Sequence, residues 1–394
     1  MLAIVAPGQG AQSPGFLTPW LELPGFEDRM HWLSAVADLD LVHYGTAADA
    51  DMIRDTAVAQ PLLVASGLVS LLALFPHPSD AFEVVGVGAG HSVGEITAAA
   101  GAHVVSAEQA MVLVRERGRA MASAAGATPT SMVAVLGGDE EEVLAVLARH
   151  GLTAANANGA GQVVAAGTLD ELAALKADPP AKARLVPLSV AGAFHTEHMA
   201  PAVETLRRYA RSISTHDPRT RLVSNRDGAV VHSGREVLER IVTQVSNPVR
   251  WDLCMRAMGE LGVTGVIEVP PAGTLTNLIK RALPGVETIA LKTPADLDAA
   301  RDLVERHGTR SPLTDSPTWR LLVSPVGGTF RAGDFPAGHD LEPGMQVGVV
   351  ATRREEQAVT APHGGTVVEW LVEDGDPVAP GQPLVRLHPE AVPA

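Results

Sequence analysis

The segment Gly90-His91-Ser92-Val93-Gly94 carries residue types suited to nucleophilic catalysis. This Gly-x-Ser-x-Gly pattern follows an apolar run and precedes an alanine-rich stretch, so the sequence predicts a strand, a tight turn and a helix. The glycines permit a turn that holds Ser92 away from the sheet, and the N–H of Val93 is then available to a developing oxyanion. A flexible glycine turn is the alternative for the bare pattern, and the strand-turn-helix context favours the nucleophile.

A serine nucleophile needs a general base to accept its proton. His195 lies just after a predicted strand, and His198 follows three residues later. The chain contains 14 histidines, so spacing alone does not select one of them. A surface or structural histidine is the alternative at each position taken singly.

The elements that would position these residues belong to the α/β class. Residues 1–125 alternate short apolar strands, at 2–6 and 84–88, with helical stretches such as 94–102, and this order is typical of a parallel sheet. Residues 130–189 predict a βαββαβ order, which is the ferredoxin-like arrangement. The α/β pattern resumes to about residue 291, so we expect the ferredoxin-like unit to be an insertion. Its predicted elements are strands 132–136, 153–156, 162–166 and 184–188 and helices 140–150 and 169–176.

An internal repeat follows a predicted helix at 295–307 and a polar, proline-bearing linker at 308–317. Residues 324–330 match residues 361–367, Gly338 matches Gly375, and Pro343-Gly344 matches Pro380-Gly381. Each pair lies 37 residues apart, and such a register indicates a true repeat. Two β-rich halves with Gly/Pro turns predict a small pseudo-symmetric sandwich.

Composition excludes several classes of protein. The net charge of −15 argues against nucleic-acid binding, and the 46% apolar content predicts a large core rather than disorder. Cys254 is the single cysteine, so neither an intramolecular disulfide nor a Cys-based metal site is expected. The first ten residues lack the features of a signal peptide, and the apolar stretch from Leu62 to Phe75 is shorter than a membrane span. We therefore expect a cytoplasmic protein with no membrane or nucleic-acid partner.

Five motifs occur in an order that resembles the acyltransferase family of malonyl-CoA:acyl carrier protein transacylases and the related polyketide-synthase acyltransferase domains. The resemblance covers roughly residues 1–292. It implies an acyltransferase domain over 1–308, with an α/β-hydrolase-like core and a ferredoxin-like subdomain at about 127–191. The motifs are Pro7-Gly-Gln-Gly-Ala-Gln12, Gly90-His-Ser-Val-Gly-Glu95, Arg117-Gly-Arg-Ala-Met121, Gly192-Ala-Phe-His195 and Gln244-Val-Ser-Asn-Pro-Val-Arg-Trp251.

The resemblance assigns expected roles to individual residues. An arginine fork binds a free carboxylate bidentately, which would favour malonyl-CoA over acetyl-CoA. Arg115 and Arg119 compete with Arg117 for that role, and only the Arg-Gly-x-x-Met context selects Arg117. The expected roles are Ser92 as acyl acceptor, His195 as base, Gln9 and Val93 as oxyanion donors, Arg117 as carboxylate ligand, Gln244 as support for the histidine, Phe194 as a steric filter against branched acyl groups, and Asn156 and Gln162 as cleft residues.

The resemblance implies transfer of a malonyl group from malonyl-CoA to the phosphopantetheine thiol of acyl carrier protein, through a malonyl-serine and a Ser–His dyad. No metal or redox cofactor is expected. A serine hydrolase or thioesterase acting on acyl-CoA or small esters is the first alternative, because Gly-x-Ser-x-Gly also marks esterases. A dedicated polyketide acyltransferase is the second, and a non-catalytic binding module is disfavoured because every expected position is filled.

The repeat resembles biotinyl/lipoyl carrier domains, which implies an all-β barrel-sandwich hybrid over 319–394 after a linker at 309–318. Arg354 falls where that family has its modified lysine, and no lysine follows Lys292. Attachment of biotin or lipoate is therefore not expected. A stabilising or docking appendage is the favoured role, and presentation of a carrier protein or an acyl-CoA carboxylase partner is the alternative. Candidate basic residues for docking an acidic carrier are Lys182, Arg184, Lys280 and Arg281.

Overall fold

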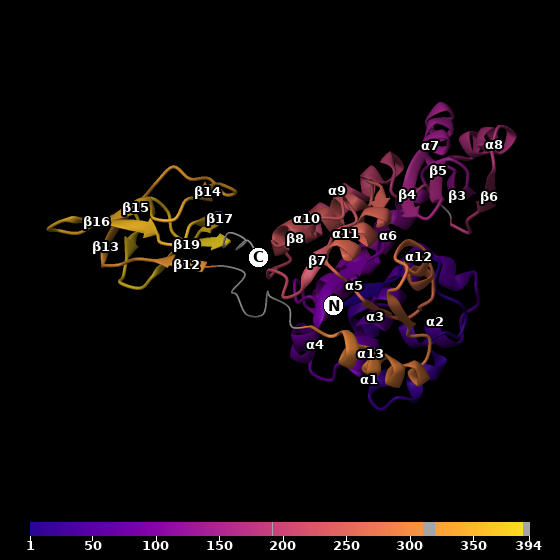
Figure 1. Ribbon diagram of the computed structural model, residues 1–394, viewed down its shortest axis with the longest axis horizontal. Helices are drawn as coiled ribbons and strands as arrows, with labels where there is room; N and C mark the ends of the chain where they lie inside the picture. The colour runs from indigo at the N-terminus through magenta and orange to yellow at the C-terminus, as the bar shows by residue number, and fades with distance from the viewer. Residues whose placement is uncertain (191, 310–319, 389–394) are drawn as a thin grey trace. The chain divides into compact units, whose positions relative to one another are not determined.

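The protein, seen here in a computed structural model, is described over residues 1–190, 192–309 and 320–388. Its contacts divide the chain into two compact units, Met1–Thr314 and Asp315–Ala394 (Figure 1). The predicted linker at 309–318 lies outside the described residues except for Thr309. Each unit is described by itself.

A mostly parallel sheet forms the centre of the first unit. Val5 and Val87 on its inner strands are fully buried, as expected for a parallel sheet covered by helices. The predicted strand at 84–88 is present but is shifted toward the serine, because the small residues at 89 and 90 continue the pairing. In spatial order the strands are β11 (Glu287–Ala290), β10 (Gly265–Glu268), β1 (Leu2–Ala6), β2 (Val85–Gly90), β7 (Arg221–Val223) and the antiparallel β8 (Val230–Val231).

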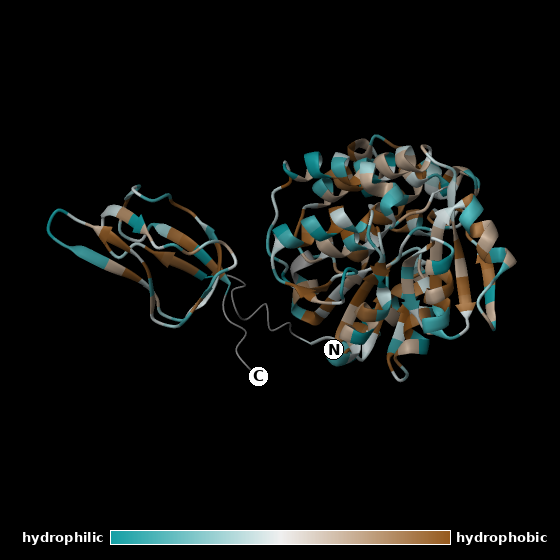
Figure 2. Ribbon diagram, turned by 90° about the horizontal axis from the view of Figure 1, so that it is seen from above, coloured by the Kyte–Doolittle hydropathy of each residue, from teal (hydrophilic) through white to brown (hydrophobic). Residues whose placement is uncertain are grey.

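Helices surround this sheet, and Figure 2 shows apolar residues in the interior of the unit with hydrophilic residues along the outer helices. The helix predicted at 295–307 begins with a short 3-10 turn. The helices are α1 (Phe26–Ala37), α2 (Leu41–Thr46), α3 (Thr56–Leu74), α4 (Pro78–Val84), α5 (Gly94–Gly101), α6 (Ala107–Ala125), α9 (Ala200–Ala210), α10 (Gly234–Gln244), α11 (Trp251–Glu260), α12 (Thr274–Ala282) and α13 (Leu297–His307), with the 3-10 helices η1 (Thr18–Glu22), η2 (Met52–Arg54), η3 (Glu197–Met199) and η4 (Pro294–Asp296).

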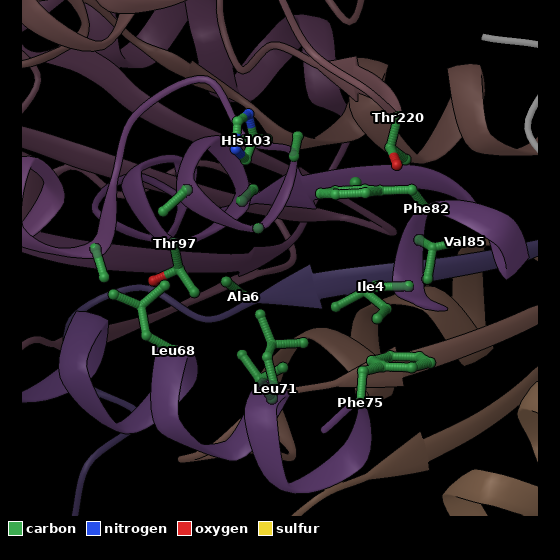
Figure 3. A pocket seen from close by; sticks show the side chains of 18 of the residues that line it. Ile4, Ala6, Leu68, Leu71, Phe75, Phe82, Val85, Thr97, His103 and Thr220 are labelled. Atoms are coloured by element: carbon green, nitrogen blue, oxygen red, sulfur yellow. The ribbon is translucent and has the colours of Figure 1, made fainter. Parts of the chain in front are cut away.

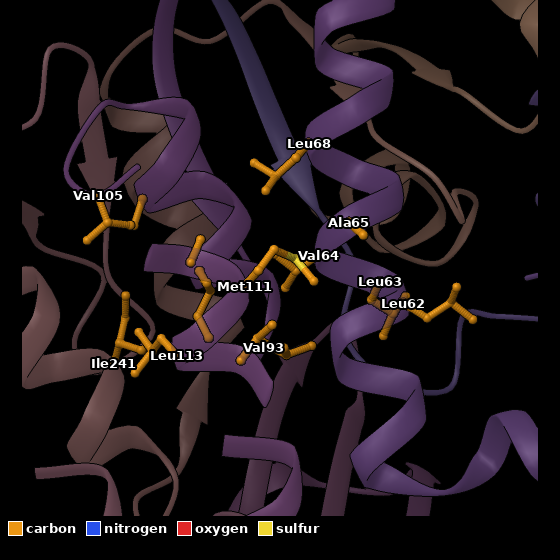
Figure 4. Close-up of a cluster of buried hydrophobic side chains, with 14 of the residues drawn as sticks. Leu62, Leu63, Val64, Ala65, Leu68, Val93, Val105, Met111, Leu113 and Ile241 are labelled. Atoms are coloured by element: carbon orange, nitrogen blue, oxygen red, sulfur yellow. The ribbon is translucent and has the colours of Figure 1, made fainter. Parts of the chain in front are cut away.

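Helix α3 is a core helix that is longer than the apolar stretch expected at residues 62–75. Among the described helices it alone has the length and apolar character that a membrane span needs, and most of it is buried inside the unit. It begins early because the Asp55 carboxylate accepts a hydrogen bond from the N–H of Ala57 at 2.8 Å, and it continues through Pro61. Leu62 and Val64 of α3 contribute to the cluster that also contains Met111 of α6 (Figure 4).

The segment expected as an insertion has the predicted βαββαβ order. The first of its helices begins after Asp139, whose side chain accepts a hydrogen bond from the N–H of Glu142 at 3.1 Å. The second strand runs three residues further than predicted, so Asn156 lies inside it rather than at its end. The elements are β3 (Thr130–Gly137), α7 (Glu140–Arg149), β4 (Thr153–Gly159), β5 (Gln162–Thr168), α8 (Leu169–Ala177) and β6 (Ala183–Pro187), in the sheet order β6-β3-β5-β4 with β9 (Val249–Arg250) added at the edge.

The second unit consists of two four-stranded antiparallel sheets. Strands from both halves of the repeat alternate between the sheets, so neither half forms a sheet of its own. One sheet has the order β12 (Arg320–Val323), β19 (Pro383–His388), β17 (Gly365–Trp370) and β14 (Asp340–Leu341), and the other has β16 (Glu356–Ala361), β15 (Met345–Ala351), β13 (Gly328–Ala332) and β18 (Pro377–Val378).

The repeat of 37 residues relates the two sheets strand by strand. Moving along the chain by this period takes β12, β13, β14 and β15 to β16, β17, β18 and β19, and the order of one sheet becomes the order of the other. Buried residues obey the same rule, since core positions fall in pairs separated by the period. These pairs are Leu322 and Val359, Phe330 and Val367, Leu341 and Val378, Val347 and Leu384, and Val350 and Leu387.

Candidate active site

Ser92 lies in a tight turn between β2 and α5 with a left-handed backbone, at φ 54°. Non-glycine residues adopt this conformation only where the surrounding structure enforces it. A side chain at Gly90 would collide with the backbone of Gly94, and one at Gly94 would collide with the carbonyl of Ala6. The two glycines therefore allow strand, turn and helix to pack closely enough to hold Ser92 at the N-terminus of α5.

The Ser92 hydroxyl and His195 form a hydrogen bond, with 2.8 Å between Oγ and Nε2. Nδ1 of His195 lies 2.9 Å from the main-chain oxygen of Gln244, which fixes Nδ1 as the protonated nitrogen and leaves Nε2 free to accept a proton. The backbone N–H of His195 donates to the carbonyl of Val245 at 3.1 Å, so the segment after α10 supports the histidine twice. The geometry suits a general base that acts on Ser92.

Arg117 reaches the same hydroxyl from α6, where its side chain is 1% exposed. Its Nη2 donates to Oγ of Ser92 at 3.2 Å and to Oε1 of Gln244 at 3.1 Å, and Nη1 donates to Oε1 of Gln60 at 2.7 Å. The next residue, Gly118, allows this approach, because a Cβ there would lie 2.8 Å from the carbonyl oxygen of Thr56 on α3. Close packing of α6 on α3 therefore brings Arg117 to Gln60.

Two further polar residues, which the sequence did not single out, support the turn from behind. Glu95 accepts hydrogen bonds from the N–H of Asn225, at 2.6 Å, and from the side-chain amide of Gln244. The Asn225 amide donates to the carbonyl of Gly90 at 2.7 Å and accepts from the N–H of Ser92 at 2.8 Å. The sequence did contain a hint of both residues. Glu95 belongs to the Ser92 motif, and Asn225 follows the carboxyl end of a parallel strand, where ligand-binding and active sites are commonly found.

Burial dominates the electrostatics of this group. Desolvation, with the Arg117 charge as the second cause, lowers the pKa of His195 to about 3, so the imidazole is neutral at pH 7. Desolvation also lowers the pKa of Arg117 to about 10, which leaves the guanidinium charged. Burial raises the pKa of Glu95 to about 8, and the hydrogen bond from Asn225 and the charge of Arg117 oppose that rise. Burial likewise raises the pKa of the Cys254 thiol behind Asn225.

The loop after β1 brings Gln9 toward the nucleophile turn. A Cβ at Gly8 would lie 2.9 Å from Nδ1 of His91, which shows how closely this loop approaches the turn. The Gln9 side chain donates to Oγ1 of Thr56 at 3.2 Å. Among the described residues, the N–H groups of Gln9 and Val93 have no hydrogen-bond acceptor in the protein. A hollow of about 170 Å³ beside Gln9 is lined also by Arg54 and Val190.

The other predicted residues are placed less directly. Phe194 is buried in the main core cluster next to His195 in sequence. Within the second strand of the insertion, Asn158 rather than Asn156 contacts the turn, with Oδ1 2.9 Å from Nε2 of His91. Asn156 has a buried side-chain oxygen without a hydrogen-bond partner, and Gln162 lines a small cavity inside the insertion. No described contact joins either of these two to Ser92.

Comparison with known proteins identifies the family of the chain. The acyl transferase domain family matches residues 4–297. The malonyl CoA-acyl carrier protein transacylase of Mycobacterium tuberculosis is 51% identical over 303 residues, which cover 77% of this chain and 100% of the relative. The Bacillus subtilis transacylase is 30% identical, covering 76% and 96% of the two chains.

Solved structures give the same result. The crystal structure of MCAT from Mycobacterium tuberculosis superposes with a TM-score of 0.74 at 51% identity, covering 76% of this chain and 99% of that one. A malonyl-transacylase in complex with its type II PKS acyl-carrier protein has a TM-score of 0.71 at 29% identity, covering 76% and 99%. The chain therefore belongs to the acyl transferase family, among the malonyl CoA-acyl carrier protein transacylases.

Proposed function

We propose that this chain transfers a malonyl group from malonyl-CoA to the phosphopantetheine thiol of an acyl carrier protein, with Ser92 as the acyl carrier in between. One observation carries the proposal. Oγ of Ser92 lies 2.8 Å from Nε2 of His195 and 3.2 Å from Nη2 of Arg117, so nucleophile, base and a buried cation meet at one atom. The family membership and the carrier-protein complex of a related transacylase support the choice of substrates.

In the first step His195 accepts the Ser92 proton as Oγ bonds to the thioester carbon. The carbon–sulfur bond then breaks, and the CoA thiol leaves with the proton from His195. In the second step the carrier thiol attacks the malonyl-serine ester, His195 accepts the thiol proton, and Oγ is released and protonated. The N–H groups of Gln9 and Val93 would stabilise the oxyanion, assisted by the N-terminus of α5.

Arg117 would bind the free carboxylate of the malonyl group. Its present acceptors are neutral oxygens of Gln60, Gln244 and Ser92, so a carboxylate offers a stronger, charge-assisted partner. An acetyl group leaves this buried cation without an anion, and the resulting penalty would give selectivity for malonyl-CoA. Gln60 and Gln244 hold the guanidinium in place for that task.

The remaining site assignments are part of the same proposal. Gln244 would orient both catalytic side chains, since its main-chain oxygen contacts His195 and its side chain contacts Arg117. Phe194 would restrict branched acyl groups. Asn156 and Gln162 would line the cleft, although only their neighbour Asn158 contacts the nucleophile turn. The proposed steps use no metal. Within residues 1–190, 192–309 and 320–388, no group of three or more His, Cys, Asp or Glu side chains is arranged to hold a metal ion.

The finer architecture is proposed on the same basis. The parallel sheet with its serine turn supports an α/β-hydrolase-like core, and the β6-β3-β5-β4 order supports a ferredoxin-like subdomain. The two related sheets of the second unit support a barrel-sandwich hybrid that resembles biotinyl/lipoyl domains. Arg354 lies in its hairpin between β15 and β16, where the Thr352 hydroxyl accepts from the N–H of Arg354 at 3.1 Å. Without a lysine there, neither biotin nor lipoate would be attached.

Intact-protein mass spectrometry tests the function directly. The protein is mixed with malonyl-CoA or acetyl-CoA, and holo acyl carrier protein is added afterwards. We expect a malonyl adduct that is absent in Ser92→Ala, loses its preference over acetyl in Arg117→Ala, and moves to the carrier thiol. Arg119→Ala is the matched control, because Arg119 lies two residues further on the same helix and pairs with Asp38 at the surface. An adduct lost to water as fast as to the thiol would instead indicate a hydrolase.

An acidic carrier protein would dock through basic residues despite the overall negative charge. Lys182, Arg184, Lys280 and Arg281 are exposed and available for this role. Lys280 and Arg281 also occupy the last turn of α12, where cations stabilise the helix dipole. Charge reversal at a docking position should raise the apparent KM for carrier protein and leave Ser92 malonylation unchanged. Equal damage to both half-reactions would refute the docking role.

A further inference from the structure

A largely apolar cavity of about 250 Å³ lies inside the first unit, apart from the group around Ser92 (Figure 3). Its walls come from α3, α4, α5, the strands β1 and β2, and the loop that joins α5 to α6. Neither Ser92, His195 nor Arg117 is among its lining residues. The cavity is therefore a second concave site, which the proposed reaction does not use.

Small side chains create the space. Large residues such as Leu71, Phe75 and Phe82 line the cavity together with small residues of α5 such as Ala98 and Gly101, which leave space unfilled. A Cβ at Gly101 would lie only 3.4 Å from Cδ1 of Leu71, so the two helices are close at one point and separate beside it. Packed interiors contain few voids larger than a water molecule, because wall atoms then lose their dispersion contacts. A filling ligand would restore those contacts.

The cavity is closed at one end and reaches the surface at the other. Ala6, Ala89 and Val269 are at most 3% exposed, whereas His103 is exposed. Figure 3 shows His103, Thr220 and Phe82 together at one side of the cavity and Leu68 with Thr97 at another. The accessible end is thus the one near His103.

Basic side chains gather at this end. The Arg219 guanidinium lies 5.4 Å from the ring centre of Phe82, and the His103 ring lies 6.1 Å from the same ring. The ring of His216 is 5.4 Å from that of His103. Desolvation, with the charges of His216 and Arg219, lowers the pKa of His103, so Arg219 supplies the positive charge at this end. An apolar interior next to this guanidinium matches an amphiphile with an apolar chain and an anionic head.

We propose that this cavity binds the acyl chain of a medium-chain fatty acid, with its carboxylate beside Arg219, His103 and His216. A cavity of about 150 Å³ accepts benzene, and at roughly 30 Å³ per water-sized group this larger one holds about eight methylene groups. Helix α5 forms part of the wall and begins two residues after Ser92. Occupancy therefore acts on the helix that directly follows the nucleophile turn, so the site gives acyl chains a route to regulate Ser92.

Calorimetric titration of the full chain with butyrate, hexanoate, octanoate, decanoate and dodecanoate tests the cavity. We expect affinity to rise about fourfold per methylene up to roughly eight carbons and then to level off. Leu71→Trp fills the cavity and should weaken octanoate binding at least tenfold, whereas Leu144→Trp places the same ring on the exposed face of α7 and should not. Circular dichroism checks that both variants are folded. Affinity without chain-length dependence, or undiminished binding to Leu71→Trp, would overturn the proposal.

The head group and the location are tested separately. Arg219→Ala should weaken octanoate about fivefold and leave 1-octanol unchanged, while Arg211→Ala, an exposed arginine on the same segment, should affect neither. An equal loss for octanoate and 1-octanol would overturn the role of the cation. Arg117→Ala should leave octanoate affinity unchanged, and loss of binding in that variant would place the ligand at Ser92 and overturn the assignment to this cavity.

Discussion

Around Ser92, side chains meet from positions far apart in the chain: His195 lies 103 residues from the serine, and Gln244 lies 127 residues from Arg117. In the second unit, core residues repeat at a fixed interval of 37 positions, as Phe330 and Val367 do. The first region is specified by polar groups that only the complete fold brings together. The second unit is specified by its 37-residue period, which relates its strands and its core residues and brings no reactive side chains together. A repeat thus defines an architecture, whereas a buried polar constellation indicates a function.

The largest expected effect is on the reaction at Ser92, and it should leave the β unit unchanged. His195→Ala removes the atom that accepts the Ser92 proton, so the rate constant of Ser92 malonylation should fall by about 10³-fold. Single-turnover mass spectrometry with malonyl-CoA measures it. His198→Ala, three residues away on η3, is the control and should stay within about twofold. A rate near that of the unchanged protein in His195→Ala would show that another group is the base.

The second largest expected effect is on the stability of the β unit. Phe330 is completely buried in the second unit and its ring lies 5.7 Å from that of Trp370, so Phe330→Ala should cost this unit about 3–5 kcal/mol of unfolding free energy. Hydrogen exchange of strands β13 and β17 measures the loss, and Phe330→Leu should lose less. Malonyl transfer should stay within twofold, because the described site residues all belong to the first unit. A parallel fall in transfer would show that the β unit contributes to the reaction.

The same contrast explains how much the sequence could predict. The Ser92 turn was predictable because its constraints are local, and the β unit was predictable because its period is visible. Gln60 was missed because a single polar residue in an apolar segment carries no spacing signal. The position of Asn225 after a strand was visible, but its contact with Ser92 was not, because that contact spans 133 residues. The exchange of strands between the two β sheets was also beyond prediction, because a repeat does not reveal which of its strands pair.

Glu95→Gln gives a smaller effect within the polar constellation. Each carboxyl oxygen of Glu95 accepts one hydrogen bond, and glutamine would replace one of these oxygens by an NH2 group that faces the donor of Asn225 or Gln244. Reorientation of the Gln244 amide would cost Arg117 one of its acceptors. We therefore expect malonylation to slow about tenfold, at an unchanged fold by circular dichroism. Glu116→Gln, next to Arg117 in sequence but paired with Arg115, should have less than a twofold effect. Equal effects would argue against a positioning role for Glu95.

Two glycines at matching positions of the repeat test whether its two halves are energetically equivalent. Gly344 and Gly381 have φ of 84° and 79°, and a Cβ at either would have no atom within 4 Å. Alanine should therefore cost only backbone strain, about 1 kcal/mol at each position, and nearly the same at both. Denaturant unfolding of the β unit measures the two losses, with Gly344→Asn expected to lose less because asparagine tolerates this region. Losses that differ by more than about 1 kcal/mol would mean that the halves are not energetically equivalent.

The smallest expected effect is the pH dependence of the malonylation rate, because burial keeps His195 neutral. Desolvation and the Arg117 charge hold the pKa of His195 at about 3, so the base is already deprotonated at pH 5.5. Malonylation by the folded protein should change less than twofold between pH 7 and 5.5, whereas a base with a pKa near 6.5 would lose about 90% of its active form. Single-turnover rates at each pH, with the folded fraction followed by circular dichroism, measure this. An inflection near pH 6.5 would contradict the buried base.

The lowered pKa of His195 should affect the free energy of unfolding of the first unit, although it leaves the malonylation rate unchanged. Because the pKa of His195 is lower in the folded state than in the unfolded chain, the unfolded state binds the proton first as pH falls. The stabilising contribution is complete above about pH 6.5 and is lost progressively toward pH 3. His195 should therefore contribute less stability as pH falls, whereas Glu95, whose pKa burial raises to about 8, acts in the opposite sense between about pH 8 and 4.5. Denaturant unfolding of the protein and of His195→Ala at each pH isolates the His195 contribution, while turnover per folded molecule stays constant. His195 belongs to the first unit, so the unfolding of the β unit should not show this contribution.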